Sequence, residues 1–398
     1  MSMEEIYEEI LGIKELQVNQ VIVSSQQIEV YCGLKLAESY CPCCLKKCHF
    51  VKQRYTRKVR DLSISGKEVY LHLTTRQFVC KSCNRHFYER LNFIDSKESV
   101  TIRYAQRLYD LCQGIELQYV VVRENLCWQT VNRIFQTYAN KALSENRSFE
   151  KVRRLGIDEI ALKKGHKNYV AVLVDLDNGQ ILDMLEDRSK EHIIKYFRQK
   201  GEVFCAQIEL FCSDLWEGYL NAAKEVFPSA RLVADRFHFF TYLQKAVDNT
   251  RKYLRRKYKD QPALKDIKWL LLKNPQQLTP KQKQQLQELF ACPDYGLLKM
   301  SYEARNEFRD ILEQDLNRDQ AETSIQTWLD KLGVNRFMND FVKFYTTWKS
   351  YVLNYFHGRY TTGIIEGINN KIKSIKRRAY GFSNFDNFKA RVQTAFCF

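Results

Sequence analysis

The amino-acid sequence predicts an α/β protein of several domains, and three observations support this prediction. The chain has 398 residues, of which 45% are hydrophobic and 13% aromatic, which is enough for packed cores. It contains only 15 Gly and 6 Pro, which argues against collagen-like and linker-dominated chains. Its hydrophobic pattern changes along the chain, from strand-like alternation to helical spacing and then to alternating strands and helices.

The net charge points to a polyanionic partner. The chain holds 63 Lys and Arg against 47 Asp and Glu, a balance of +16. Phosphates attract such side chains and release counterions on contact, so we expect nucleic acid. Residues 1–30 hold one Lys and six Glu, whereas residues 31–100 hold 14 Lys and Arg against 6 Asp and Glu. We therefore separate an acidic N-terminal segment, 1–34, from the basic region after it.

The location follows from what the sequence does not contain. Residues 1–10 are acidic, unlike a secretory signal, and apolar runs such as Tyr169–Val174 are too short to cross a bilayer. We expect a cytoplasmic protein without a membrane partner. In a reducing compartment its 13 cysteines favour metal ligands and buried thiols over disulfides.

Residues 35–95 are predicted to form a zinc-ribbon-like module. Two C-x-x-C pairs lie at its ends, and strand-like alternation separates them. The four thiolates of Cys41, Cys44, Cys80 and Cys83 could surround a Zn²⁺ ion tetrahedrally and leave no open position, which indicates a structural zinc. Four nearby residues are rival ligands: Cys43, Cys48, His49 and His86. Buried free cysteines are the alternative interpretation.

Residues 96–148 are predicted to form a helix-turn-helix. Thr101 suits an N-cap for a first helix. A short helix at Leu117–Arg123, a turn at Glu124–Cys127 and a longer helix at Trp128–Tyr138 would follow. The last helix would then enter the major groove with four polar side chains, Gln129, Thr130, Asn132 and Arg133. The alternative is an ordinary three-helix packing unit.

From residue 149 the pattern becomes α/β. Three strands separated by short connections are followed by a helix, a strand, a helix and a strand, which is the element order of a ribonuclease H-like domain. The predicted strands are Arg154–Ile160, Tyr169–Leu176, Gln180–Leu185, Ala206–Ser213 and Ala230–Ala234, and the helices are Glu191–Gln199 and Leu215–Val226. The domain would comprise residues 149–239 and 351–398.

Residues 240–350 read as an α-helical insertion into that domain. Its segment Arg251–Lys259 carries six positive charges in nine residues, more than a solvated helix face needs. We predict that this segment binds DNA through four side chains, Arg251, Lys252, Arg255 and Arg256.

Three carboxylates are candidates for a catalytic metal site. Phosphodiester cleavage at a ribonuclease H-like site needs about three carboxylates to hold two Mg²⁺ (or Mn²⁺) ions. Asp158 lies in the first predicted strand, Asp214 follows the fourth, and Glu366 lies in the helix after the insertion. Other acidic residues compete less well: Glu159 points to the opposite face by strand alternation, Asp175 and Asp177 flank a turn, and Asp235 is a further candidate. His238, three residues after Asp235, is either a site residue or a structural histidine.

The helix that carries Glu366 has two faces. An apolar stripe would pack on the sheet through Ile364, Ile368, Ile372 and Ile375. Another face aligns a carboxylate with an amide and two cations, Glu366, Asn370, Lys373 and Arg377. Glu366 would then hold metal, while Lys373 and Arg377 contact DNA phosphates. The alternative is an ordinary surface glutamate on an amphipathic helix.

These motifs together resemble the ISL-three family of bacterial insertion-sequence transposases, from about residue 30 to the C-terminus. The resemblance is carried by the C-x-x-C pairs and helix-turn-helix together with Gly156–Glu159, Lys163–His166, Cys212–Trp216 with Gly218 and Tyr219, Phe227–Ala230, Asp235–His238, Thr362–Lys373 and Arg378–Phe382. Asp235 and His238 are similar to the [C/D]-x-x-H element of related transposase superfamilies, and the insertion before Glu366 also resembles theirs.

The resemblance implies a Mg²⁺-dependent DDE transposase that cuts double-stranded DNA at terminal inverted repeats and joins the 3′ hydroxyl to target DNA. Asp158, Asp214 and Glu366 would be its metal-binding triad, with His238 beside them. Synapsis of two DNA ends implies at least a homodimer. Two alternatives stay open: a transposase-derived DNA-binding regulator without catalysis, and a nuclease or resolvase without strand transfer.

Overall fold

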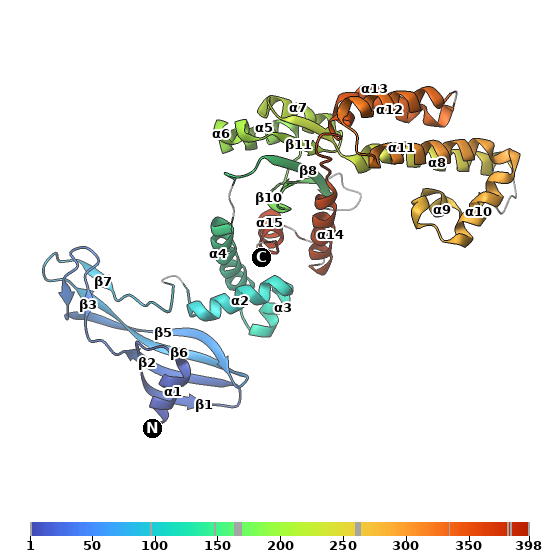
Figure 1. Cartoon of the computed structure of the whole chain (residues 1–398). Coiled ribbons are helices and arrows are strands. Elements are labelled where there is room, and N and C mark those ends of the chain that lie inside the picture. Colours follow the sequence, from blue (N-terminus) through green and yellow to red (C-terminus); the bar gives the residue numbers. More distant parts are fainter. Residues whose placement is uncertain are drawn as a thin grey trace. The chain divides into compact units, whose positions relative to one another are not determined.

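The computed structural model describes residues 2–95, 98–146, 149–162, 169–258, 264–333, 335–379, 382 and 384–396. The chain divides into two compact units, residues 1–144 and 145–398 (Figure 1). The fold is mixed α/β, as predicted. None of the helices in the described ranges has both the length and the hydropathy that a membrane span requires.

The first unit is built on a twisted sheet of strands in the order β1-β2-β6-β5, with β7 paired to β6. All pairs are antiparallel except β2 with β6. The elements are α1 (Met3–Leu11), β1 (Leu16–Val23), β2 (Gln27–Leu34), β5 (Val51–Ile64), β6 (Lys67–Val79), β7 (His86–Tyr88) and a small hairpin of β3 (Ser39–Tyr40) with β4 (Lys47–Cys48). Thus β1 and β2, from the acidic first segment, belong to the same sheet as the basic β5.

Three helices complete the first unit: α2 (Ile102–Gly114), α3 (Leu117–Glu124) and α4 (Trp128–Asn146). Thr101 caps α2 by accepting the N–H of Tyr104, which confirms the predicted N-cap. Asn125 ends α3 in the left-handed region, with φ 51°, and so makes the tight turn before α4. The fully buried Asp61 of β5 accepts hydrogen bonds from Thr101 and Arg103 and so holds α2 on the sheet.

The second unit contains a five-stranded sheet in the order β10-β9-β8-β11-β12. Its strands are β8 (Arg154–Ala161), β9 (Tyr169–Asp175), β10 (Gln180–Leu185), β11 (Leu210–Ser213) and β12 (Arg231–Ala234). β8, β11 and β12 run parallel, and β9 is antiparallel to both of its neighbours. The predicted strand at Ala206–Ser213 is wrong at its start, because Glu202–Gln207 form a short helix, α6, in which Gln207 donates to Phe149 and Val152 carbonyls.

Helices cover both faces of this sheet, because alternate residues of its central strands point in opposite directions. Ala171 and Leu173 pack with α5 (Lys190–Lys200) and α7 (Glu217–Val226). Val172 and Val174 pack on the other face with α14 (Gly363–Arg378) and α15 (Phe385–Thr394).

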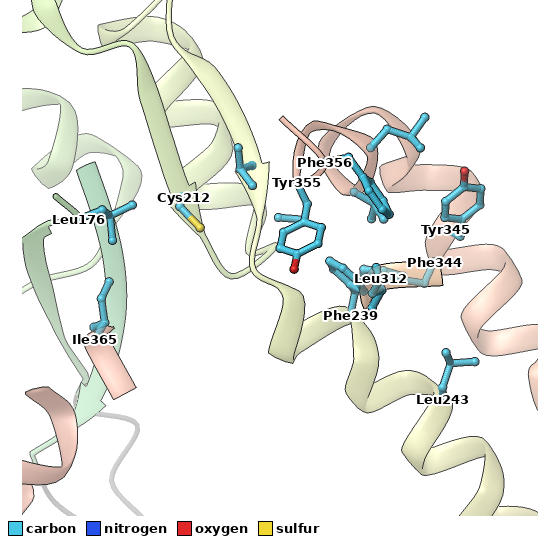
Figure 2. Close-up of a cluster of buried hydrophobic side chains, with 14 of the residues drawn as sticks. Leu176, Cys212, Phe239, Leu243, Leu312, Phe344, Tyr345, Tyr355, Phe356 and Ile365 are labelled. Atoms are coloured by element: carbon cyan, nitrogen blue, oxygen red, sulfur yellow. The ribbon is translucent and has the colours of Figure 1, made fainter. Parts of the chain in front are cut away.

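The predicted insertion is mostly helical in its described residues, with loops and short 3₁₀ turns between its helices. It begins with α8 (Arg236–Lys257), directly after β12, and continues through α9 (Lys268–Leu272), α10 (Pro280–Ala291), α11 (Gly296–Glu313), α12 (Arg318–Lys331) and α13 (Asn339–Asn354). Its core is continuous with the sheet, since Phe239, Leu312 and Phe344 belong to the same buried cluster as Leu176 and Cys212 (Figure 2). The insertion is therefore part of the second unit.

Candidate active site and nucleic-acid surfaces

Four cysteine sulfurs gather at one end of the first unit. The Sγ atoms of Cys41, Cys44, Cys80 and Cys83 lie within 4.8 Å of one another, and the Cys41–Cys83 and Cys44–Cys80 pairs are 3.5 Å apart. Among the described residues, this is the only group of three or more His, Cys, Asp or Glu side chains gathered so closely. The set is the one that the spacing predicts, and it suits a closed tetrahedral zinc site.

The two cysteine turns have the same construction. In each turn the first cysteine donates its N–H to the carbonyl five residues on, Cys41 to Lys46 and Cys80 to Arg85. The residue before that carbonyl is left-handed in both: Leu45 at φ 58° and Asn84 at φ 54°. Backbone N–H groups then point at the sulfur, and those of Cys83 and Ser82 lower the pKa of Cys80 to about 6, although burial opposes them. Backbone N–H groups likewise lower the pKa of Cys41, so each turn favours the thiolate of its first cysteine. In Cys44 and Cys83, backbone N–H groups act in the same direction, but neighbouring sulfurs and burial raise the pKa.

Of the rival zinc ligands, only Cys48 lies beside the four-thiol cluster, where its sulfur neighbours that of Cys80. Cys43 is exposed, and the buried Cys48 donates its thiol to the Lys46 carbonyl. The His49 ring lies 3.6 Å from the carboxylate of Glu38, and the His86 ring lies 3.1 Å from the Lys52 ammonium. The four-thiol set is therefore the one that the fold assembles.

The second unit aligns three aspartates on neighbouring parallel strands. Ser213 of β11 pairs with Ile157 of β8 on one side and with Ala234 of β12 on the other. The next residue on each strand is an aspartate: Asp158, Asp214 and Asp235. Because neighbouring strands lie about 4.8 Å apart, these residues form a row across the sheet at its carboxyl-terminal side.

Asp158 is held from two sides. Its Oδ1 accepts the N–H of Glu159 at 2.7 Å, and its Oδ2 accepts the side-chain amide of Asn369 at 2.9 Å. Burial raises the pKa of Asp158 to about 6; the charges of Asp214 and Asp235 act in the same direction, and those of His238 and Lys373 oppose it. Burial also raises the pKa of Asp214, again against the effect of His238. These groups therefore share one electrostatic site.

The packing of α14 differs by one residue from the prediction. Ile364 is 47% exposed, whereas Ile365 is fully buried together with Ile368 and Ile372. The expected start of the apolar stripe at Ile364 is therefore wrong. The reason is a close approach at Gly156 of β8, where a Cβ atom would lie 2.6 Å from side-chain carbons of both Ile365 and Leu176. Figure 2 shows Ile365 beside Leu176 at this point.

The rotation of α14 decides which side chains reach the aspartates. Asn369, buried at 4% exposure, contacts Asp158, while Glu366 lies one turn earlier with an exposed side chain. Asn370, Lys373 and Arg377 are also exposed on α14. The sequence interpretation missed Asn369, because helical spacing alone does not tell it from Asn370.

Several buried polar atoms around the aspartate row have no hydrogen-bond partner among the described residues. They are Oδ2 of Asp235, Oδ1 of Asn369 and the hydroxyl of Tyr219. The charges of Asp214 and Asp158 both act on the Tyr219 hydroxyl, and burial is the main cause that raises its pKa. The unpaired buried oxygens of Asn369 and Tyr219, beside the carboxylates of Asp158 and Asp214, match the hard oxygen donors that Mg²⁺ or Mn²⁺ prefers. The residues present therefore fit a divalent cation.

Arg188, which the sequence interpretation also missed, connects the surroundings of Asp158 and Asp214. Its guanidinium lies over the rings of Tyr169 and Trp216, at 4.5 and 4.9 Å, and forms an ion pair with Glu159. Trp216 in turn folds over Gly218, where a Cβ atom would lie 2.2 Å from the indole ring. This explains why the motif after Asp214 contains both a tryptophan and a glycine.

The side chains predicted to contact DNA from the first unit lie at the start of α4. Gln129 and Arg133 are exposed, while Thr130 and Asn132 are half-buried. Arg133 forms an ion pair with Glu98. The Thr130 hydroxyl lies 3.0 Å from the sulfur of Cys127, in the turn before the helix.

The predicted basic segment of the insertion divides into two groups. Lys252, Arg255 and Arg256 are exposed, although Lys252 also contacts Asp248. Arg251 is 7% exposed, is paired with Asp248 and donates to the Leu264 carbonyl. Arg251 therefore stabilises the insertion from within and is not placed to meet DNA.

Parts of three sequence motifs fall outside the described residues. These parts are Lys163–His166, Lys259 at the end of the basic segment, and Tyr380 with Gly381 in the last motif.

Comparisons with known proteins give a consistent result. Residues 155–392 match the family model for the DDE domain of ISL3 transposases, described as "Transposase", and residues 38–83 match the "zinc-finger of transposase IS204/IS1001/IS1096/IS1165". The transposase for insertion sequence element IS1001 of Bordetella parapertussis is 30% identical over 363 residues, 89% of this chain and 88% of that protein. The transposase for IS1557 of Mycobacterium tuberculosis is 25% identical over 291 residues, 65% of this chain and 63% of that protein.

Proposed function

The chain belongs to the ISL3 family of insertion-sequence transposases, and we propose that it binds the terminal inverted repeats of an insertion sequence, cleaves the DNA and joins the 3′ end to a target. The observation that carries this proposal is the row of Asp158, Asp214 and Asp235 on adjacent strands, with Asn369 of the Glu366 helix bonded to Asp158. Two elements that are far apart in the sequence thereby meet at one site.

We assign the second unit a ribonuclease H-like catalytic fold. Numbered within that unit, its strands run in the order 3-2-1-4-5, with the second strand antiparallel to its neighbours and helices on both faces. Such a sheet places side chains from its first and fourth strands next to each other, as Asp158 and Asp214 are.

Asp158, Asp214 and Glu366 would hold the catalytic Mg²⁺ or Mn²⁺ ions. When bound, such ions make the attacking oxygen a stronger nucleophile and stabilise the leaving oxygen. The chain itself supplies orientation, since Asn369 fixes the Asp158 carboxylate and the Arg188 cluster supports the segment after Asp214. The exposed His238 imidazole, whose charge acts on Asp158 and Asp214, would exchange a proton at or near the scissile phosphate.

DNA would be held by three groups of residues. The α4 side chains Gln129, Thr130, Asn132 and Arg133 would enter the major groove as the second helix of a helix-turn-helix. Lys252, Arg255 and Arg256 of α8 and Lys373 and Arg377 of α14 would contact phosphates. When DNA binds, Arg133 would leave its ion pair with Glu98 and contact the DNA instead.

The zinc-ribbon module would hold a structural Zn²⁺ through its four thiolates. Because a transposase must bring two DNA ends together, we propose that the protein acts as a homodimer or a larger oligomer on DNA. The alternative, a regulator that binds DNA without cutting it, is disfavoured by the retained carboxylates, which such a regulator does not need.

The substitution Asp214→Asn tests this function. It removes one metal-binding charge and keeps the size of the side chain, so cleavage of a DNA fragment with the element's ends should fall at least about 1,000-fold, or about 4 kcal/mol in barrier height. Binding of the same fragment should not change. Glu209→Gln, on a residue outside the proposed site, is the matched control and should cut normally. Cleavage by the Asp214→Asn variant at the wild-type rate would refute the triad.

A further inference from the structure

We propose that Asp235 is a positioning residue that anchors the first turn of α14 and thereby sets the Glu366 carboxylate against Asp158 and Asp214. This inference rests on the proposed function, because it concerns how Glu366, a proposed metal ligand, is held in position. It assigns Asp235, three residues before His238, a task that differs from metal binding.

The anchoring contact is a single buried hydrogen bond. Oδ1 of Asp235 accepts the backbone N–H of Thr362 at 3.0 Å, and the two residues are 127 positions apart in the chain. Both are buried, at 1% and 5% exposure. Thr362 directly precedes Gly363, the first residue of α14, so the bond joins the end of β12 to the start of this helix across the whole insertion.

The start of α14 needs such an acceptor. A helix leaves its first N–H groups without intrahelical partners, and the side chain of Thr362 makes no capping hydrogen bond. Asp235 provides this acceptor from the end of β12, which pairs with β11 in the sheet.

The contact is well placed to control Glu366. Glu366 donates its N–H to the Thr362 carbonyl, so the residue that Asp235 holds also begins the turn that carries Glu366. On the far side of Glu366, Asn369 bonds to Asp158. The catalytic helix is therefore tied to the sheet on both sides of Glu366, at β12 and at β8.

The second oxygen of Asp235 takes no part in the anchoring contact. Oδ2 is buried without a hydrogen-bond partner among the described residues, and the Nε2 atom of His238 lies 3.9 Å away, beyond hydrogen-bond distance. Anchoring α14 requires only Oδ1, which an asparagine side chain also provides.

The experiment compares Asp235→Asn with Asp235→Ala in the full-length protein. If Oδ1 is what matters, Asp235→Asn keeps cleavage within about 3-fold of wild type. Asp235→Ala should cleave at least about 30-fold more slowly and should need a several-fold higher Mg²⁺ concentration for half-maximal rate, with unchanged binding to the DNA ends. Wild-type kinetics for the alanine variant would overturn the proposal, as would an asparagine variant as slow as alanine, since the charge and not the anchor would then be required.

A backbone variant protects the test against a folding defect. Thr362 has φ −83°, within about 20° of the value that proline imposes, so Thr362→Pro removes the donated N–H while the φ of residue 362 changes little. It should reproduce the slow cleavage and raised Mg²⁺ requirement, and the double variant with Asp235→Ala should be no slower than either single variant. Additive losses would contradict a shared contact.

A parallel Glu366→Gln variant separates this inference from the proposed function. If Glu366→Gln cuts normally, the triad itself is wrong. If Glu366→Gln is inactive but Asp235→Ala and Thr362→Pro are not impaired, only the positioning role fails.

Discussion

The two candidate metal sites of this protein are built in opposite ways. The four thiols come from two turns of identical construction and lie within 4.8 Å of one another. The proposed carboxylate site draws on β8, β11 and α14, holds buried oxygens of Asn369 and Tyr219 that have no hydrogen-bond partner among the described residues, and keeps Glu366 exposed. The first site has a full set of four ligands, whereas the second contains buried oxygens that no described residue pairs with.

This difference indicates different tasks. A closed set of four soft ligands would tie the two cysteine turns together around a structural ion. An open set of hard ligands, supported by Asn369 and Arg188, would suit a substrate that must enter and leave. We therefore expect the first site to contribute stability and the second to contribute reactivity.

Loss of zinc should have the largest effect. Binding of structural zinc contributes about 10–16 kcal/mol in small zinc domains. Cys80→Ser should reduce zinc from about one ion per chain to almost none, and should expose the first unit to limited proteolysis while the second unit stays protected. Metal analysis and proteolysis measure both effects. Cys43→Ser, at an exposed cysteine outside the set, is the matched control; equal zinc loss in that variant would contradict the ligand assignment.

Removing the Asp158 charge should stabilise the metal-free protein while it abolishes cleavage. The pKa of Asp158 is raised in the folded state to about 6, so the stability that its protonated form contributes is present below about pH 4 and is lost as the pH rises through 6. Asp158→Asn avoids this loss, since Asn369 can turn its amide to pair with the new side chain. We expect a gain of about 1–3 kcal/mol at pH 7.5.

Thermal unfolding at several pH values, with a chelator present, measures this gain. It should disappear below pH 4, where the aspartate is protonated in both states. A variant that is less stable than wild type at pH 7.5 would show that burial of the charged Asp158 carboxylate does not destabilise the folded protein.

The smallest effect concerns the basic surface of the insertion. Arg255→Gln with Arg256→Gln should lower the salt dependence of DNA binding by a slope of about 2, because two phosphate contacts are lost. Arg251→Gln should instead lower the melting temperature and leave the slope unchanged, since Arg251 is buried against Asp248. Binding titrations at several salt concentrations distinguish the two; a reduced slope with Arg251→Gln would place this residue on the DNA surface after all.

The sequence predicts the residues of one candidate metal site more completely than those of the other. The zinc ligands follow from spacing, because each C-x-x-C turn forms locally and the strands between them bring the ends together. The positions of Asp158 and Asp214 follow from strand patterns, since one follows Ile157 and the other follows Ser213 in paired strands. The prediction of a strand from Ala206 fails where a short helix is stabilised by non-local contacts of Gln207.

The errors and omissions in the site have one common cause, which is that they depend on contacts between distant elements. Ile365 replaces Ile364 in the core because Gly156 lets the helix approach β8 closely. Asn369 and Arg188 have no local signal, because their partners lie 211 and 29 positions away.

By itself, the amino-acid sequence indicated the family through its combined motifs. Local spacing and periodicity predicted the four-cysteine set, the helical insertion and the strands that carry the aspartates. Tertiary structure alone decided the rotation of α14, the alignment of Asp235 with the other aspartates, the burial of Arg251 and the anchoring of Thr362. Each of these is set by how closely two packed surfaces approach, and that distance depends on side chains that the local pattern does not contain.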